Sequence, residues 1–415
     1  MTDPIAWSPV TVVSLVIFLS FLGAILSSRL KVSYPTVIIA IGLALSILRV
    51  GGALQSVPFD STVILGFVVP PMIFEAAMRT RLETFRTVEK TVISLAIFGV
   101  LISAIVTGLV LNIVTGLPLA VALMFGVIVS PTDPVSVVSL LKRARAPERL
   151  TALLESEAYF NNATPVILYS VAASLSFNPF SLGTFAYNLL GGVGVGLLVS
   201  AVAELLHKLI TEPLAETSFT IAVMFGSYAL AESLGMSGLI AVPIAGLYMG
   251  NRTMRTAMSE ETRTTMTKFW EVVTFMATSF AFLLIGLRTD FTLLITYAPF
   301  IAAAFLAILV ARVVSVYPII GLVNMMRENI PRSWTRVIAF AGLRGAVSIA
   351  LALSLPETRF KNAIVAMTFG VALLSLVVQA EIMQVHFKTA KLTSYAENKQ
   401  QPTPRPVSTP SPDNQ

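Results

Sequence analysis

The sequence has no cysteine and only two histidines, His207 and His386, among its 415 residues. Without cysteine, disulfide bonds, thiolate metal sites and cysteine nucleophiles are excluded, and two histidines are too few for a histidine-rich metal centre. Charge is also scarce, because 12% of the residues are charged, against about 25% in ordinary soluble domains. Together with 55% hydrophobic residues, this composition excludes a soluble globular protein.

The sequence also lacks a nucleotide-binding motif. The run from Gly191 to Gly196 superficially resembles a phosphate loop, but it has no Lys-Ser/Thr ending and lies in an apolar stretch, which favours tight helix packing. We therefore expect no cofactor and no enzymatic activity. Any transport must draw on an ion gradient or a partner, unless the chain is a channel.

Long apolar stretches are what the sequence does contain, and about 20 such residues cross a bilayer core. We predict an all-α polytopic membrane protein with about 13 transmembrane helices. Residues 1–10 lack the basic segment of a cleaved signal peptide, so the first stretch is expected to remain as a helix. The predicted spans are 10–28, 32–48, 62–78, 91–111, 117–141, 150–174, 182–206, 217–234, 239–249, 269–287, 293–323, 337–355 and 363–385.

The basic residues are distributed unevenly between the two sides of the predicted membrane. Loops after odd-numbered spans carry 18 Lys and Arg, and loops after even-numbered spans carry 4. Because basic loops face the cytoplasm, we predict a cytoplasmic-membrane protein with its N-terminus outside and its C-terminus inside. The net charge of +6 therefore indicates no nucleic-acid partner, and residues 388–415 are predicted to form a short disordered cytoplasmic tail.

Only two of the 28 Lys and Arg, Arg312 and Arg344, fall inside predicted spans. A charge at mid-membrane costs at least about 2.5 kcal/mol, so it persists where it is paired or functional. Taken singly, each acidic residue in a span is as consistent with a structural ion pair as with a functional role. The acidic residues available to these arginines are Glu75, Asp133, Glu155 and Glu157.

Two prolines interrupt the fifth span, in the segment Ser130-Pro131-Thr132-Asp133-Pro134. Each proline removes a backbone donor and clashes with the preceding turn, so the helix must unwind there. Unwound backbone at membrane depth lines a cavity or is buried in protein, and its carbonyls can bind ions. Thr132 and Asp133 supply the oxygen ligands that a hard monovalent cation prefers. The alternative is a simple proline kink with a capping aspartate.

The sixth span adds Glu157 and, four residues later on the same helix face, Asn161, which is followed by Asn162. Adjacent asparagines in a membrane helix can serve as interhelical hydrogen-bonding groups. Next to Thr132 and Asp133, we interpret them as further oxygen ligands of the same monovalent cation.

The twelfth span is predicted to be interrupted as well, because Arg344 lies between Gly342 and Gly345. If spans 1–6 and 8–13 are repeats, the broken helices 5 and 12 hold matching positions, and the seventh span inverts the second repeat. Two inverted six-helix repeats whose broken helices cross at the ion site are typical of secondary transporters.

With these residues in place, the sequence resembles the monovalent cation:proton antiporter superfamily, in the sodium/proton branch of archaeal and bacterial antiporters and animal sodium/proton exchangers. The resemblance extends over roughly residues 10–387. It rests on Pro70 to Ala77, Ser130 to Val135, Glu155 to Ala163, Phe282 to Leu287, Arg312 and, most specifically, Gly342 to Pro356.

The resemblance implies a homodimer in which a moving core alternates its access, elevator-like, beside a dimerisation part. Residues 1–90 (helices 1–3) and 176–290 (helices 7–10) would form the interface part, and 91–175 (helices 4–6) and 291–387 (helices 11–13) the core. It assigns Thr132, Asp133 and Asn161 to the ion site and pairs Glu157 with Arg344. Glu75 and Arg312 match recurrent family positions, and together with Glu157 and Arg344 they are expected to form structural ion pairs near the site.

Two residues depart from the family pattern. Asn162 replaces the usual aspartate, and Ala158 stands where a serine is common. An amide cannot titrate, so either Asp133 bears the exchange or the chain is inactivated. We expect an electroneutral sodium or lithium/proton antiporter, with a transport-silent cation-binding or regulatory protein and an ion channel as alternatives.

Overall fold

The structure is a computed structural model that describes residues 9–30, 34–47, 64–173, 180–210, 212–288 and 291–389. Within these residues every regular element is a helix. The predicted disordered tail lies outside the described residues, except for the last two residues of the final helix. The first elements are α1 (Pro9–Leu30), α2 (Tyr34–Ile47), the π-helical segment η2 (Ile64–Val68), α4 (Val69–Arg79) and α5 (Leu82–Arg86).

The elements that follow come in three groups. The first is α6 (Glu89–Ser94), η3 (Leu95–Gly99), α7 (Val100–Thr115), α8 (Leu119–Ile128), α9 (Pro134–Arg143) and α10 (Glu148–Ala173). The second is α11 (Phe180–His207), α12 (Pro213–Ser233), α13 (Gly238–Tyr248), η4 (Met249–Thr253), α14 (Met254–Thr256) and α15 (Glu260–Arg288). The third is α16 (Phe291–Thr296), α17 (Ala298–Met325), α18 (Arg332–Phe340), α19 (Ala346–Leu353), α20 (Lys361–Leu374), η5 (Ser375–Gln379) and α21 (Ala380–Thr389).

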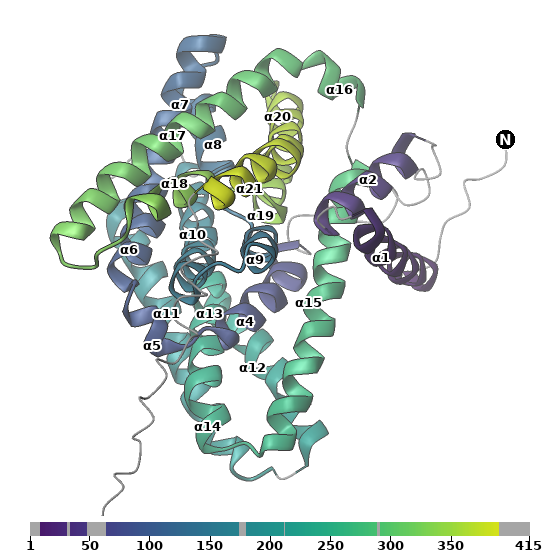
Figure 1. The fold of residues 1–415 in the computed structure, drawn as a ribbon, viewed down its shortest axis with the longest axis vertical. Helices are drawn as coiled ribbons and strands as arrows, with labels where there is room; N and C mark the ends of the chain where they lie inside the picture. The colour runs from purple at the N-terminus through teal and green to yellow at the C-terminus, as the bar shows by residue number, and fades with distance from the viewer. Residues whose placement is uncertain are drawn as a thin grey trace, which may run out of the picture.

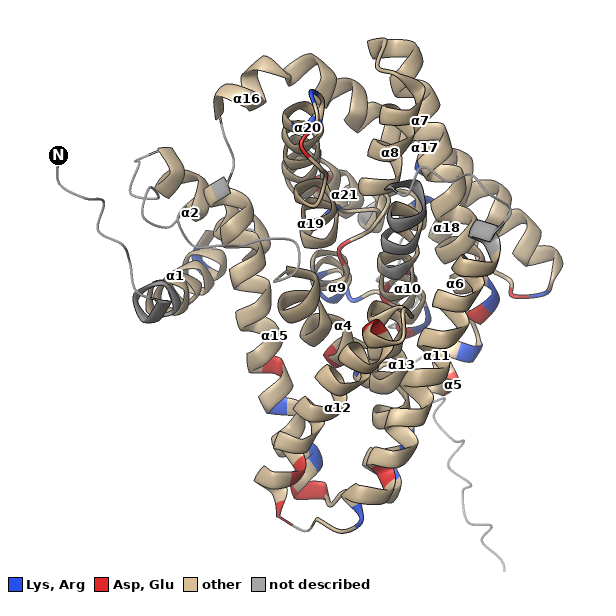
Figure 2. Ribbon diagram, turned by 180° about the vertical axis from the view of Figure 1, so that it is seen from behind, with Lys and Arg blue, Asp and Glu red and all other residues tan. Residues whose placement is uncertain are grey.

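Six of the helices in the described part of the chain are long and apolar enough to cross a membrane. They confirm the predicted class, an all-helical membrane protein, and Figure 2 shows most of the charged residues at helix ends and in the connections between helices. The count of thirteen spans and the inverted repeats stay predictions. The six helices cover Glu89–Thr115, Ala186–His207, Pro213–Ser233, Glu260–Leu287, Ala298–Met325 and Lys361–Phe387.

Two connections between helices lie deep inside the molecule. Residues 129–133 separate α8 from α9, and residues 341–345 separate α18 from α19. Figure 1 shows α9, α10 and α19 in the middle, with α7 and α17 on one side and α15 on the other. Apolar packing holds this arrangement, with one buried cluster that includes Phe74, Phe125 and Trp270 and a second that includes Leu140 and Leu153.

The glycine-rich run of α11 packs closely against α13. A methyl group on Gly192 would lie 2.7 Å from the Ser237 carbonyl oxygen, and one on Gly196 would lie 2.5 Å from the Ala241 carbonyl oxygen. These contacts confirm that the run serves helix packing, since only residues without a Cβ allow the two backbones to approach so closely.

Candidate ion-binding site

The two interrupted segments touch each other directly. The Asp133 amide donates a hydrogen bond to the Leu343 carbonyl oxygen at 2.8 Å. On the other side, a methyl group on Gly345 would lie 2.7 Å from the Asp133 Cβ and 2.9 Å from its Oδ1. Gly345 therefore lets the second segment lie against the carboxylate, which places Asp133 where the two segments meet.

Asp133 begins α9 and keeps its carboxylate inside the protein. The side chain is 3% exposed, and its Oδ2 accepts a hydrogen bond from the Ser136 amide at 2.8 Å. This is an N-cap, which satisfies one of the free amides at the helix start. The positive end of the α9 dipole also favours a negative charge here. The predicted capping role and a role in binding cations are therefore compatible in one residue.

A cavity of about 10 Å³ lies beside this carboxylate. Its lining includes Thr132, Asp133, Asn162, Gly345 and, from α4, Met72. Asn162 is 2% exposed, and its Oδ1 has no hydrogen-bond partner among the described residues. A volume of this size holds about one water molecule, so it also suits one dehydrated cation surrounded by oxygen ligands.

Asn161 is not part of the lining of this cavity, and it forms hydrogen bonds with Thr132. Its Oδ1 accepts hydrogen bonds from the Thr132 amide at 3.1 Å and from the Thr132 hydroxyl at 3.2 Å, and its Nδ2 lies 2.9 Å from the same hydroxyl. The structure thus brings Thr132, Asp133 and Asn162 together around the cavity. It places Asn161 as a residue that positions Thr132.

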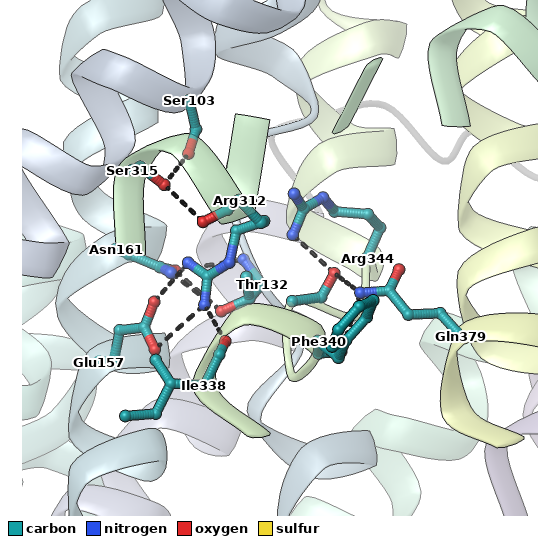
Figure 3. Close-up of polar contacts among 11 residues, drawn as sticks. Ser103, Thr132, Glu157, Asn161, Arg312, Ser315, Ile338, Phe340, Arg344 and Gln379 are labelled. Carbon is teal, nitrogen blue, oxygen red and sulfur yellow. Dashed lines mark hydrogen bonds and ion pairs between the residues drawn. The ribbon is translucent and has the colours of Figure 1, made fainter. Parts of the chain in front are cut away.

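The prediction that Glu157 pairs with Arg344 is wrong. The Glu157 carboxylate forms its ion pair with Arg312, with 2.7 Å between Oε1 and Nη1, and Arg312 also donates to the Ile338 carbonyl oxygen at 2.7 Å. Figure 3 shows Arg312, from α17, reaching Glu157 across the site. Arg312 and Glu157 come from helices that both pack against α6 and η3, and the two long side chains meet there, whereas Arg344 lies on the connection before α19.

Arg344 is buried at 2% exposure and forms no ion pair within the part of the chain that the structure describes. Its Nη1 donates to the Gly342 carbonyl oxygen at 2.7 Å, and its amide donates to the Ser375 hydroxyl at 3.0 Å. The expectation of an acidic partner for this arginine is therefore also wrong. The Gly342 carbonyl oxygen is the hydrogen-bond acceptor that its guanidinium has in place of a carboxylate, and the positive charge stays in the core.

Glu75 was expected to form an ion pair near the site, and its partner is the basic residue one turn along its own helix. The Glu75 carboxylate forms an ion pair with Arg79. The Arg79 guanidinium also forms an ion pair with Glu271 of α15, with 2.7 Å between Nη2 and Oε1. Arg79 was missed because it was counted as a loop residue. The four-residue spacing from Glu75 to Arg79 is the signal that predicts the pair.

Gln379 is a second residue that the sequence analysis missed. Its Nε2 donates to the Phe340 carbonyl oxygen at 2.9 Å and to the Gly342 carbonyl oxygen at 3.2 Å, as Figure 3 shows in part. These are the carbonyls freed where α18 ends, so Gln379 holds the interruption in place. A polar amide in an otherwise apolar span would have indicated this role.

The fold and site define a class of protein. A helical membrane protein with two interrupted segments that meet at a buried carboxylate is a secondary transporter in architecture. The sequence matches the family model described as "Sodium/hydrogen exchanger, transmembrane" over residues 16–388. The chain belongs to this family.

Known members of the family are similar over most of the chain. The Na(+)/H(+) antiporter ApNhaP of Aphanothece halophytica is 34% identical, covering 90% of this chain and 72% of its own length. The Na(+)/H(+) antiporter NhaH of Halobacillus aidingensis is 33% identical, covering 78% and 82%. The structure of the sodium proton antiporter MjNhaP1 from Methanocaldococcus jannaschii has the same fold, with a TM-score of 0.76, 22% identity and coverage of 92% and 98%.

Proposed function

We propose that this chain exchanges sodium or lithium for protons across the cytoplasmic membrane by alternating access. The observation that carries the proposal is the small cavity that Thr132, Asp133 and Asn162 line where the interrupted helices meet. Its relatives in Aphanothece halophytica and Halobacillus aidingensis are named Na(+)/H(+) antiporters, which supports these two ions as substrates.

The mechanism is competition for one carboxylate. In one state the Asp133 carboxylate, the Thr132 oxygen and the free Asn162 Oδ1 bind a dehydrated monovalent cation. In the other state a proton neutralises Asp133, and the cation leaves. Both states carry the same charge, so one proton exchanges for one cation and the exchange is electroneutral.

The position of the cavity supports a moving core. Thr132, Asp133 and Asn162 belong to residues 91–175, whereas Val69, Met72 and Ile73 line the cavity from the proposed interface part. A site between the two parts opens to one side or the other when the core slides. Residues 1–90 and 176–290 would then provide the stationary part and the homodimer contact, with the N-terminus outside and the C-terminus inside.

Asn162 favours a second candidate, a transport-silent cation-binding protein. Asp133 is the only carboxylate among the described residues that line the cavity, and the Asn162 amide cannot take a proton. A site with a single carboxylate can bind a cation and yet couple it poorly to proton movement.

Purified protein in liposomes distinguishes these functions. An imposed pH gradient drives sodium flux if the chain is an antiporter, and the flux is unaffected by membrane potential if the exchange is electroneutral. Sodium binding without any flux would identify the transport-silent protein. Sodium conductance that needs no pH gradient would contradict both functions and identify a channel.

A further inference from the structure

Basic side chains gather at one end of the proposed core. Three segments meet there: residues 86–90 before and in the first turn of α6, 145–149 at the start of α10, and 326–336 from the end of α17 into α18. Figure 2 shows basic residues at the start of α6 and in the connection that follows α17. We name the basic residues of these segments the basic patch: Arg86, Lys90, Arg145, Arg149, Arg327, Arg332 and Arg336.

Direct contacts hold the three segments together. The Glu328 carboxylate accepts a hydrogen bond from the Lys90 amide at 2.6 Å. The Arg149 guanidinium donates to the Thr87 carbonyl oxygen at 2.9 Å, and its central carbon lies 5.8 Å from the centre of the Trp334 ring. The basic patch therefore belongs to one region of the folded protein, although its residues come from three parts of the sequence.

No residue of the basic patch forms an ion pair within the described part of the chain. The three segments contain seven basic and three acidic residues, so four positive charges are in excess. Of the acidic residues, Glu148 pairs with Arg81 at 3.5 Å, and Glu328 caps the first amides of α6. Like charges repel one another at short range, so an anion from outside the chain would stabilise this region.

Other basic residues on the same predicted side of the membrane are neutralised within the chain. Arg252, Arg255 and Arg263, in η4, α14 and α15, form ion pairs with carboxylates at 2.9, 3.6 and 3.2 Å. The positive-inside rule accounts for the side on which all these basic residues lie. It does not account for the absence of carboxylate partners in the basic patch.

The basic patch lies where membrane-spanning helices end. Lys90 is in the first turn of the long apolar helix that begins with α6, and Arg327 lies two residues after α17. In the last turn of α17, the side chains of Leu322 and Met325 are 60% and 81% exposed, as expected of residues that contact lipid tails. Basic residues at this depth lie among phospholipid headgroups. An acidic soluble partner would leave the exposed apolar side chains beside the patch unexplained.

We propose that the basic patch binds anionic phospholipid headgroups of the cytoplasmic leaflet, and that transport therefore depends on anionic lipid. The proposal rests on the proposed function for the orientation of the chain and for the movement of the core. A negatively charged leaflet attracts basic segments next to membrane helices. Bound headgroups relieve the repulsion among the segments that hold α6, α10 and α18, which come from both halves of the proposed core. We therefore expect anionic lipid to stabilise the core and to accelerate transport.

Thermal unfolding of the purified full chain in detergent tests lipid binding without requiring transport. Phosphatidylglycerol, an anionic lipid, should raise the melting temperature more than phosphatidylcholine does. The triple variant Arg327→Gln/Arg332→Gln/Arg336→Gln should lose this difference. All three residues are exposed, and their side chains form no hydrogen bond in the described part of the chain, so the variant should fold as the parent does.

Two controls separate binding at the basic patch from a general effect of charge. The matched variant Arg255→Gln/Arg263→Gln/Lys268→Gln removes three charges on the same predicted side but outside the patch, and it should keep the phosphatidylglycerol effect. Choline chloride tests the parent itself. Raising its concentration from about 0.1 M to about 1 M shortens the Debye length from about 10 Å to about 3 Å, so the phosphatidylglycerol effect should shrink markedly.

Soluble anions identify the source of the negative charge. Neither glycerol phosphate nor polyglutamate should reproduce the phosphatidylglycerol shift. An equal shift with glycerol phosphate would identify a soluble phosphate site, and a shift with polyglutamate alone would identify an acidic protein partner. Either result would overturn the proposal, as would an equal phosphatidylglycerol shift in the parent and in the triple variant of the patch.

Flux in liposomes measures the consequence for transport. Sodium-dependent proton flux of the parent should be faster in vesicles that contain phosphatidylglycerol than in phosphatidylcholine alone, and the triple variant of the patch should show no such gain. Equal flux of the parent in both lipids would overturn the lipid dependence of transport. Absence of flux in both lipids would overturn the proposed function alone, because the unfolding experiment decides lipid binding separately.

Discussion

The Asp133 amide and the Leu343 carbonyl oxygen, 2.8 Å apart, join the two interrupted helices by a direct backbone hydrogen bond. The same contact brings Gly345 against the Asp133 carboxylate. The ion site is therefore built from two segments far apart in the sequence. Any change that separates them acts on the site even when no ion ligand is altered.

Substitution of Gly345 by alanine should disrupt the site. The added methyl group would lie 2.7 Å from the Asp133 Cβ, so one segment must shift, at a cost of about 1 to 3 kcal/mol. We expect weaker sodium binding and a lower melting temperature, measured by calorimetry. The control is Gly321→Ala in α17, where a Cβ meets nothing within 4 Å; its binding should equal that of the parent.

Two substitutions of Asp133 distinguish the contribution of its negative charge from that of its N-cap hydrogen bond to Ser136. Asp133→Ala should abolish sodium binding and also remove the N-cap, which costs about 1 kcal/mol. Asp133→Asn can still accept the Ser136 hydrogen bond, so it should abolish binding with less loss of stability. Sodium binding and thermal unfolding of both variants check this expectation. Sodium affinity retained in Asp133→Asn would show that the carboxylate is not the ligand.

The two buried arginines should differ in their contribution to stability. Arg312→Leu leaves the Glu157 carboxylate buried without its partner, which typically costs about 3 to 5 kcal/mol. Arg344→Leu leaves no carboxylate without a partner, so its cost should be clearly smaller. Thermal unfolding of the two variants in detergent makes the comparison. Equal destabilisation would mean that Arg344 also neutralises a carboxylate.

Asn162→Asp should increase coupled exchange strongly. The new carboxylate would line the cavity beside Asp133 and supply a second group whose charge changes with protonation. Sodium-dependent proton flux in liposomes at several pH values measures the gain. Asn161→Asp is the matched control, and it should instead lower transport, because an ionised carboxylate cannot donate to the Thr132 hydroxyl. If the parent already transports as fast as Asn162→Asp, Asp133 alone carries the coupling.

Much of this architecture could be predicted because membrane solvation restricts the sequence severely. Apolar length located the helices, and Pro131 and Pro134 located the interruption at Asp133, since proline acts on its own backbone. The sequence also predicted that Thr132, Asp133 and Asn162 lie close together, because these polar residues occupy a similar depth in two neighbouring spans.

The choice of ion-pair partners could not be predicted in the same way. The sequence offers two arginines inside predicted spans, Arg312 and Arg344, as partners of Glu157. It does not show which of them lies near Glu157 in the folded protein. The structure decides for Arg312, because α17 and α10 both pack against α6 and η3, which brings the Arg312 guanidinium to the Glu157 carboxylate. Gln379 was overlooked because only charged residues were counted in the spans. An uncharged amide in an apolar span also needs hydrogen-bond partners, and the freed carbonyls at the end of α18 provide them.

The unpaired Arg344 bears on which cations the protein can accept. Its neighbours Leu343 and Gly345 both touch Asp133, so a permanent positive charge belongs to the same segment as the site. A monovalent ion neutralises Asp133, whereas a divalent ion would add an unbalanced positive charge to a core that already holds one. We therefore expect magnesium and calcium not to compete with sodium, which makes valence, and not ionic radius alone, a basis of selectivity.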